Sequence, residues 1–224
     1  MPTSSSAARP HAAVMSAALD LFAQQGFEST SVEQIAQAAG MSRSTFFRQF
    51  GGKDDVIFAD HEVLLAMLRD DLSAPHDNPW TAVRDASLKV YRHFASDPQL
   101  ARRRYTVVRQ VPALREREIV TVFRYERLFD EYLRGALPGL DPVDAVSFAA
   151  TVTAIHNHVL RRLIRGSKRV PTSVLRDALN DAMRRFGVLE EDAEPAPDDM
   201  LVAVFPRRMP AAEVARRLQH DLER

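Results

Sequence analysis

Residues 31–50 read SVEQIAQAAGMSRSTFFRQF, and this stretch decides the fold. Gly40 separates two short segments whose apolar residues recur at helical spacing. Glycine suits such a turn because its left-handed backbone conformation brings two helices together at a sharp angle without a Cβ clash. Small Ala36 and Ala39 permit close approach of the two helices. A helix, a glycine-containing turn and a second helix predict a helix-turn-helix.

One face of this unit is apolar and the other is polar. We expect the buried face to contain Ile35, Ala36, Ala39, Met41, Phe46 and Phe50, covered by Val14, Ala18, Leu21 and Phe22 of a preceding helix. The side chains left exposed on the second helix are Ser42, Arg43, Ser44, Thr45, Phe47, Arg48 and Gln49. Their hydroxyl, guanidinium and carboxamide groups are the kinds that reach base edges and phosphates.

Charge is distributed unevenly around this helix. Between Met41 and Lys53 there are three cations and no acid, although the whole chain balances 30 basic residues against 30 acidic ones. We expect a phosphate beside Lys53, where it would accept from the ammonium group and from free amides at the start of the next helix. The alternative is a solvated face on which Lys53 is incidental.

Helix breakers lie almost entirely between apolar stretches of the chain. All eight glycines and most prolines do so, and Asn78-Pro79, Asp97-Pro98 and Asp141-Pro142 each carry an N-cap acceptor followed by a proline at the first helical position. This pattern predicts an all-α protein. The expected helices are 11–25, 31–39, 42–50, 53–74, 79–97, 98–111, 112–134, 142–165 and 172–186.

The predicted domain organisation has three parts. Residues 1–52 form the helix-turn-helix domain, 53–189 a larger helical domain, and 190–224 a linker and C-terminal extension. The linker, 190–199, is acidic and contains proline; a short strand is expected over 200–205 and a small helix after Pro210. The extension either packs across a partner subunit or is a disordered appendage.

Composition excludes several functional classes. Cysteine is absent, which removes disulfides, thiolate metal sites and cysteine nucleophiles. No apolar run is long enough to span a bilayer, and the first residues lack the apolar core of a secretory signal, so we expect a cytoplasmic protein with no membrane partner. We find no H-x-x-x-H, glycine-rich phosphate loop or G-x-S-x-G, so no enzyme activity, catalytic residue, metal or cofactor is predicted.

Residues 17–53 carry a family resemblance. The segments AALDLF (17–22), GF (26–27), TSVEQIA (30–36) and AGMSRSTFFRQF (39–50), followed by Lys53, resemble in order and spacing the N-terminal domain of TetR-family transcriptional regulators. The resemblance implies an all-α, dimeric protein whose N-terminal unit binds operator DNA. It also implies a C-terminal domain that dimerises and binds a small ligand, whose binding usually releases the DNA.

The resemblance assigns DNA-facing roles by position. They fall on Thr30, Ser31, Ser42, Arg43, Ser44, Thr45, Phe47, Arg48, Gln49 and Lys53. The family often has tyrosine at the position of Phe47, histidine at that of Gln49 and glycine at that of Ser44. Phe47 can still press against a sugar or a thymine methyl, and Gln49 can pair with adenine.

The larger domain matches no short motif. For ligand binding we select Tyr91, Tyr105, Phe123 and His156, with ordinary core packing as the alternative for each. An arginine-rich segment, with Arg102, Arg103, Arg104, Arg109, Arg115 and Arg117, is interpreted as an ion-paired helix surface. A second nucleic-acid site, or one arginine paired with an anionic ligand, stays open.

Two apolar stripes run along the expected helix 142–165, which is unusual on the surface of a monomer. We assign the bulkier stripe, with Phe148, Val152, Ile155, Val159 and Leu163, to the domain core. The second we assign to a two-fold interface of Val146, Ala150, Thr153, Asn157 and Leu160, joined by Leu175 and Leu179. The alternative is a fully buried central helix in a monomer.

These features together predict a ligand-responsive transcriptional repressor that binds a palindromic operator as a homodimer. Two alternatives stay open. One is an activator of the same family. The other is a helical adaptor that keeps the helix-turn-helix shape without binding DNA.

Overall fold

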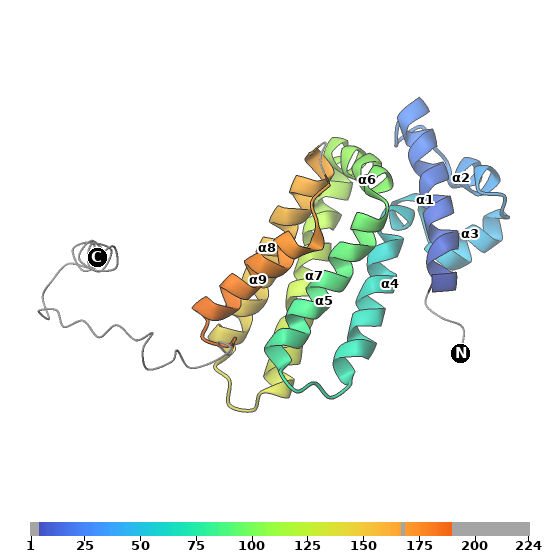
Figure 1. The fold of residues 1–224 in the computed structure, drawn as a ribbon. Helices are drawn as coiled ribbons and strands as arrows, with labels where there is room; N and C mark the ends of the chain where they lie inside the picture. The colour runs from blue at the N-terminus through green and yellow to red at the C-terminus, as the bar shows by residue number, and fades with distance from the viewer. Residues whose placement is uncertain (1–4, 167–168, 190–224) are drawn as a thin grey trace, which may run out of the picture. The chain divides into compact units, whose positions relative to one another are not determined.

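A computed structural model describes residues 5–166 and 169–189, and this part of the chain consists of helices joined by turns (Figure 1). The helices are α1 (Ser5–Gln25), α2 (Val32–Ala38), α3 (Arg43–Phe50), α4 (Lys53–Ser73), α5 (Pro79–Ser96), α6 (Pro98–Gln110), α7 (Pro112–Ala136), α8 (Pro142–Arg165) and α9 (Thr172–Arg185). The all-α prediction is confirmed. The strand and helix expected after residue 189 lie outside the described residues. No helix within the described ranges has the length and apolar character needed to cross a membrane.

Local hydrogen bonds build the helix-turn-helix. Ser31 caps α2 in a capping box: its hydroxyl accepts from the Gln34 amide at 3.2 Å, and the Gln34 side chain accepts from the Ser31 amide at 2.8 Å. Ser42 caps α3 by accepting from the Thr45 amide at 3.1 Å. Between the two helices Gly40 has a φ of 68°, in the left-handed region that glycine adopts most readily.

The proline-headed helices begin where the sequence predicts. The side chains of Asn78, Asp97 and Asp141 accept from backbone amides two or three residues further on, at 2.8–3.1 Å. Each is followed by a proline at the first helical position, where no amide hydrogen is needed. These caps fix the starts of α5, α6 and α8 and hence the register of their buried faces.

The apolar residues form two core clusters. The first contains residues of α1, α2, α3 and the start of α4, joined by Val107 and Val108 of α6 and Leu114 of α7. The second lies among the later part of α4 and helices α5, α7, α8 and α9. In Figure 1, α4 and α6 lie between the α1–α3 group and the remaining helices. Because α6 contributes apolar side chains to the first core, movement of this helix would change the packing beneath the helix-turn-helix.

Candidate functional site

Helix α3 divides sharply into a buried and an exposed face. Phe46 and Phe50 are 0% and 7% exposed, whereas Phe47 between them is 42% exposed. The outward residues are those predicted: Ser42, Arg43, Ser44, Phe47, Arg48 and Gln49 are exposed, and Thr45 is half-buried. The buried phenylalanines anchor the helix, which leaves its polar face free to contact another molecule.

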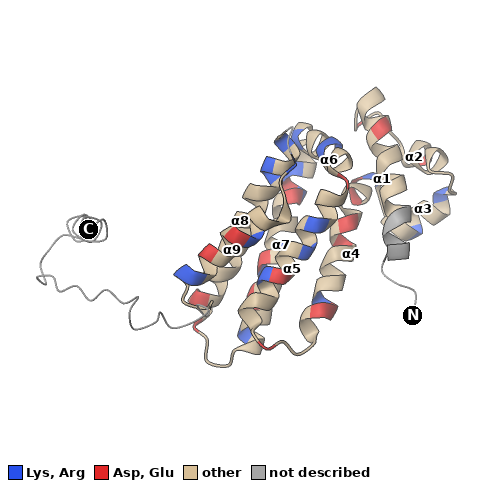
Figure 2. Cartoon of the chain, viewed as in Figure 1, with Lys and Arg blue, Asp and Glu red and all other residues tan. Residues whose placement is uncertain are grey.

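A single ion pair lies across the turn from α3. The Arg43 guanidinium donates to Glu33 of α2 at 2.8 Å and also lies 5.5 Å from the centre of the Phe47 ring. Both ionic side chains are at least half exposed, so water competes strongly for the pair. Figure 2 shows basic residues on α3, and the exposed Arg43–Glu33 pair is weak enough to leave the guanidinium open to another anionic partner.

Lys53 has a different role from the one predicted. Its ammonium donates to three backbone carbonyls of the α1–α2 loop, those of Phe27 at 2.7 Å, Thr30 at 3.2 Å and Glu28 at 3.4 Å. It also lies 4.3 Å from the centre of the Phe27 ring. An ammonium group has three N–H donors, and all three have partners here. The expectation of a free cation beside a phosphate is therefore corrected: Lys53 fastens the loop that precedes α2.

Thr30 and Ser31 also act within the fold. Thr30 is 2% exposed, and its hydroxyl donates to the Gly26 carbonyl at 2.8 Å and accepts from the Gln25 side chain at 3.2 Å. The prediction that Thr30 faces DNA is wrong for this conformation because the hydroxyl lies inside the α1–α2 loop. Ser31 is exposed, but its hydroxyl is engaged in the cap of α2.

A cavity of about 330 Å³ lies among α4, α5, α6, α7 and α8. Its apolar wall includes Val90, Phe94, Phe129, Leu160 and Ile164, and its polar lining includes His61, Arg104, Glu118, Thr121 and Tyr125. Volume and lining are those of small-molecule sites, which are mostly apolar with a few placed polar groups.

Three of the four predicted ligand residues line this cavity. Tyr105, Phe123 and His156 are on its wall, and Phe123 is 58% exposed at the surface. Tyr91 is not on the wall. It is fully buried in the second core, and its hydroxyl donates to the Val170 carbonyl at 2.8 Å. The ring packs in the core and the hydroxyl has its hydrogen-bond partner within the chain, so the prediction that Tyr91 lines the cavity is corrected.

The predicted interface residues divide between the core, the cavity and the surface. Leu175 and Leu179 of α9 are 0% exposed, which corrects their assignment, because they pack inside their own chain. Thr153 is also buried, at 6% exposed, and lines the cavity together with half-buried Asn157 and Leu160. The second stripe of α8 therefore lies largely against the cavity rather than the surface. Ala150 is half-buried, and Val146 is 41% exposed.

Burial disfavours the charged form of the two histidines that line the cavity. Desolvation holds the pKa of His61 well below its ordinary value, with the nearby Arg104 charge adding to the effect. The same cause lowers the pKa of His156 to about 4. The His61 Nδ1 lies 3.1 Å from the Tyr125 hydroxyl, and the His156 Nδ1 lies 3.1 Å from the Ser87 hydroxyl. Each imidazole thus has one polar partner fixed by its own fold.

The arginines of α6 join helices rather than cover a surface. Arg102 donates to the Ile164 carbonyl at 3.1 Å near the end of α8. Arg103 donates to Asp20 of α1 at 2.5 Å. Arg104 is 7% exposed and donates through Nε to the Ile57 carbonyl of α4 at 2.9 Å. The interpretation as an ion-paired surface is therefore corrected for Arg102 and Arg104, whereas Arg103 does form a partly exposed ion pair, with Asp20.

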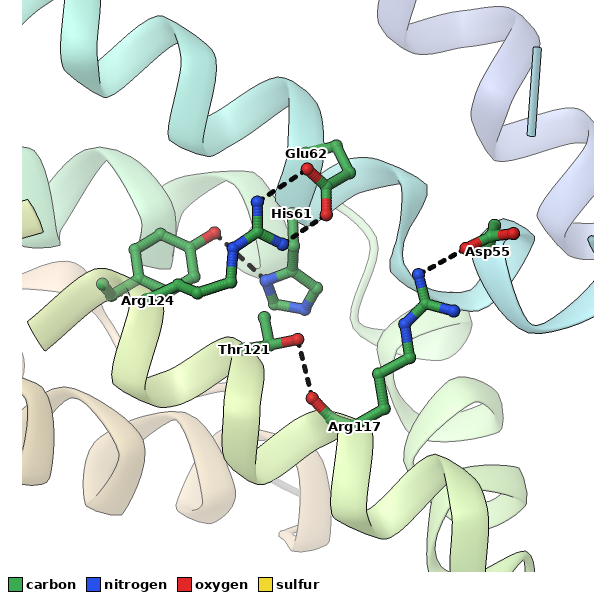
Figure 3. A network of polar contacts seen from close by, with 7 residues as sticks. Asp55, His61, Glu62, Arg117, Thr121 and Arg124 are labelled. Atoms are coloured by element: carbon green, nitrogen blue, oxygen red, sulfur yellow. Dashed lines mark hydrogen bonds and ion pairs between the residues drawn. The ribbon is translucent and has the colours of Figure 1, made fainter. Parts of the chain in front are cut away.

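A second set of ion pairs joins α7 to α4 (Figure 3). Arg124 binds Glu62 through two hydrogen bonds, which hold the pKa of that carboxyl below its usual value. Arg117 binds Asp55, in the first turn of α4. Together with Arg103 and Arg104, these pairs connect the helices around the cavity to the helices of the first core.

Sequence reasoning missed His61 and Tyr125 as cavity residues. His61 falls in the apolar series of α4, between Ile57 and Leu64, where a titratable group must have a reason to be buried. That interruption of the apolar stripe was the available signal. Tyr125 gave none, because a tyrosine in an apolar stripe is typical of a core.

The exposed α3 face and the cavity define a helix-turn-helix protein with an internal cavity in its larger helical part. Residues 14–59 match the family model described as bacterial regulatory proteins, tetR family. This part of the chain, the helix-turn-helix and the helix segments on either side of it, is therefore similar to the N-terminal domain of that family. Among the described residues, no group of three or more His, Cys, Asp or Glu side chains could hold a metal ion.

Individual relatives agree with this family. The chain is 31% identical over 102 residues to the HTH-type transcriptional repressor Rv1474c of Mycobacterium tuberculosis, covering 40% of this chain and 53% of that protein. It is 42% identical over 73 residues to the HTH-type transcriptional regulator TcmR of Streptomyces glaucescens, covering 31% of each. The chain thus spans about half the length of these curated relatives or less. The SmeT–triclosan complex has the same fold, with a TM-score of 0.58 and 18% identity over 84% of this chain and 98% of that one.

Proposed function

We propose that this protein is a DNA-binding transcriptional regulator and not an enzyme. The observation that carries the proposal is the α3 helix, which is anchored by Phe46 and Phe50 and presents Arg43, Arg48 and Gln49 outward. A helix held this way places its side chains in a major groove, where arginine contacts phosphate or guanine and glutamine contacts adenine. Curated relatives named as transcriptional regulators support this function. Such a role places the protein in the cytoplasm with the DNA.

The proposed division of labour follows the predicted domains. Residues 1–52 read DNA, and residues 53–189 bind a small ligand in the cavity and form a homodimer. Val143 and Val146, which are 66% and 41% exposed at the start of α8, provide apolar surface for a second copy. Two recognition helices spaced by one turn of DNA, roughly 34 Å, then read a palindromic operator.

The proposed regulation is repression relieved by ligand. A ligand changes DNA affinity only through its different affinity for the DNA-binding and released conformations. Helix α6 can carry this difference, because it lines the cavity with Arg104 and contributes Val107 and Val108 to the first core. A cavity better formed in the released conformation makes the ligand an inducer.

DNA binding is tested by gel shift with the DNA that flanks the gene, at several salt concentrations. We expect a sequence-specific shift that weakens as salt rises, since phosphate contacts release counterions. Arg48→Ala should weaken it at least about tenfold, in the range of losing one specific contact. Arg127→Ala is the matched control, because Arg127 is also exposed and its ion pair among the described residues is with Glu131 of its own helix. No shift with any sequence would support the adaptor function instead.

A further inference from the structure

The polar groups of the cavity gather around one buried cation. Arg104 is 7% exposed and lies 5.1 Å from the centre of the Phe58 ring. His61, Glu118 and Tyr125 line the same cavity, and all three lie close enough to interact electrostatically with its guanidinium or to be influenced by it. This corner lies where α4, α6 and α7 meet, and the rest of the wall is mainly aliphatic and aromatic.

The hydrogen bonding of Arg104 is incomplete. Its Nε donates to the Ile57 carbonyl, while its Nη1 lies 3.7 Å from the Glu118 carboxylate, which is too long for a hydrogen bond. Its buried Nη2 has no hydrogen-bond partner among the described residues, and neither has the buried Nε2 of His61. A buried donor left unpaired costs about 1–3 kcal/mol, and more when it is charged. The Arg104 Nη2 can only donate, so it favours an incoming acceptor.

We infer that the cavity binds an amphipathic carboxylate, and that Arg104 recognises its carboxylate group. This inference rests on the proposed function as a ligand-responsive regulator. The Nη1 and Nη2 groups of a guanidinium match the two oxygens of a carboxylate. In the tautomer in which the Tyr125 hydroxyl donates to His61 Nδ1, the His61 Nε2 carries the proton and is a further donor to the ligand.

The apolar wall of the cavity determines the size and apolar character of the ligand body that is attached to the carboxylate. Val90, Phe94, Phe129, Leu160 and Ile164 can enclose an alkyl chain or an aromatic ring. The cavity holds about 330 Å³, which is near the lower end of the range for small-molecule sites. Ile119 and Phe123 are each 58% exposed and also line the cavity, so a longer apolar body can continue past them.

A cationic ligand fits these charges less well. The lining carries two cations, Arg104 and Arg161, and one acid, Glu118. Glu118 is the group a cation would seek, but it is already the nearest carboxylate to buried Arg104. Pairing it with a ligand cation would leave the buried guanidinium with only the more distant Asp60 as a counter-charge, which is unfavourable.

Binding of a carboxylate by Arg104 would also affect the hydrogen bond from Arg104 to the Ile57 carbonyl of α4. Its Nη2 has essentially no exposed area, so the guanidinium must turn toward the cavity to meet a carboxylate. That turn strains the bond from Nε to the Ile57 carbonyl, and Ile57 is a fully buried member of the first core. Ligand binding and the Arg104–Ile57 bond therefore compete.

The test is isothermal titration calorimetry on the full chain without DNA. Decanoate and 2-naphthoate represent alkyl and aryl carboxylates, with decanamide, 2-naphthamide and decyltrimethylammonium as matched neutral and cationic probes. We expect at least one carboxylate to bind about tenfold or more tightly than its amide, as a charge-assisted pair gives. The preferred carboxylate decides between alkyl and aryl ligands.

Variants assign the preference to Arg104. Arg104→Gln should remove it, and Glu118→Gln should tighten carboxylate binding because it removes the competing acid. Arg127→Gln, outside the cavity, should change nothing. If Arg104→Gln fails to fold, the inference is still tested by the affinities of the wild type for carboxylate and amide and by the carboxylate affinity of Glu118→Gln. Three results would overturn the inference. The wild type could bind the amide or the ammonium probe as tightly as the carboxylate, or bind no carboxylate at all. The Glu118→Gln variant could bind the carboxylate more weakly than the wild type does. Because no DNA is present, this result is separate from the gel shift.

Discussion

Arg117 of α7 binds the carboxylate of Asp55 in the first turn of α4 (Figure 3). The Asp55 Oδ2 also lies only 3.0 Å from the position that a Cβ on Gly51 would occupy, at the end of α3. One carboxylate thus meets both a helix beside the cavity and the turn that ends the DNA-facing helix. The pair provides a second connection between cavity and DNA-binding unit, besides Arg104.

A double-mutant cycle measures this connection. Asp55→Asn, Arg117→Gln and the combined variant are compared by chemical denaturation at low and high salt. Because both side chains are more than a third exposed, we expect a coupling free energy of about 0.5 kcal/mol at low salt that shrinks as salt screens the charges. A coupling of several kcal/mol, or one insensitive to salt, would contradict the partly exposed geometry.

The turn after α3 favours glycine at position 51. Gly51 has a φ of 80°, and an added Cβ would also press on the Asp55 carboxylate. Gly40 has a similar φ of 68° but open space around it. Gly51→Ala should therefore lower the free energy of unfolding by more than Gly40→Ala, which we expect to cost about 1 kcal/mol.

The Gly51 prediction has an internal control. Combining Gly51→Ala with Asp55→Ala removes the carboxylate that the new Cβ would meet. We expect part of the loss to be recovered in chemical denaturation. If Gly51→Ala and Gly40→Ala lower the free energy of unfolding equally, the contact with Asp55 does not contribute to the cost.

Lys53→Met separates a loop contact from a phosphate contact. The substitution removes three hydrogen bonds to carbonyls, so we expect a loss of about 1–3 kcal/mol in the free energy of unfolding. The dependence of log affinity on log salt should stay the same, because Lys53 releases no counterion from DNA. Arg48→Ala should reduce that slope by about 1. If Lys53→Met reduces the slope as much as Arg48→Ala, Lys53 contacts a phosphate after all.

Buried His156 makes the fold sensitive to acid. Its pKa in the folded chain is about 4, below the 6.5 of an exposed histidine, so the unfolded chain takes up the proton first as pH falls. This histidine therefore has no effect on stability above about pH 6.5 and costs progressively more down to about pH 4, on the order of 3 kcal/mol in all.

Denaturation at pH 7 and at pH 4.5 checks this prediction. His156→Gln keeps a polar group near Ser87 but does not titrate, so it should lose less stability between the two pH values than the wild type. Carboxylates that titrate in the same range affect both proteins alike. An identical loss in both would mean that His156 is already accessible to protons in the folded chain.

Local signals account for what the sequence predicted well. The caps Asn78, Asp97 and Asp141 act on amides within three residues, so they position the helices regardless of the rest of the fold. The exposed face of α3 follows equally from local periodicity, since Phe46 and Phe50 occupy one side of the helix. Two DNA-facing candidates outside α3 were less secure. Lys53 bonds to backbone carbonyls more than twenty residues earlier, and the Thr30 hydroxyl turns back to the Gly26 carbonyl inside its own loop.

The C-terminal assignments failed where partners are far apart in the chain. An apolar stripe on α8 or α9 indicates that a face is buried but does not identify what buries it. Leu175 and Leu179 pack within their own chain, and Thr153 faces the cavity. Arg104 could not be distinguished from its neighbours Arg102 and Arg103, because its burial depends on α4, some fifty residues earlier.

In vitro selection of DNA by the full chain, repeated with Gln49→Ala, tests DNA reading by α3 most directly. We expect the wild type to enrich an inverted repeat. Gln49→Ala should retain the repeat but lose the preference at one base pair in each half, since one side-chain contact to a base is worth about 1–3 kcal/mol of discrimination. Enrichment of no sequence by the wild type, or an unchanged base preference with Gln49→Ala, would contradict recognition through the exposed face of α3.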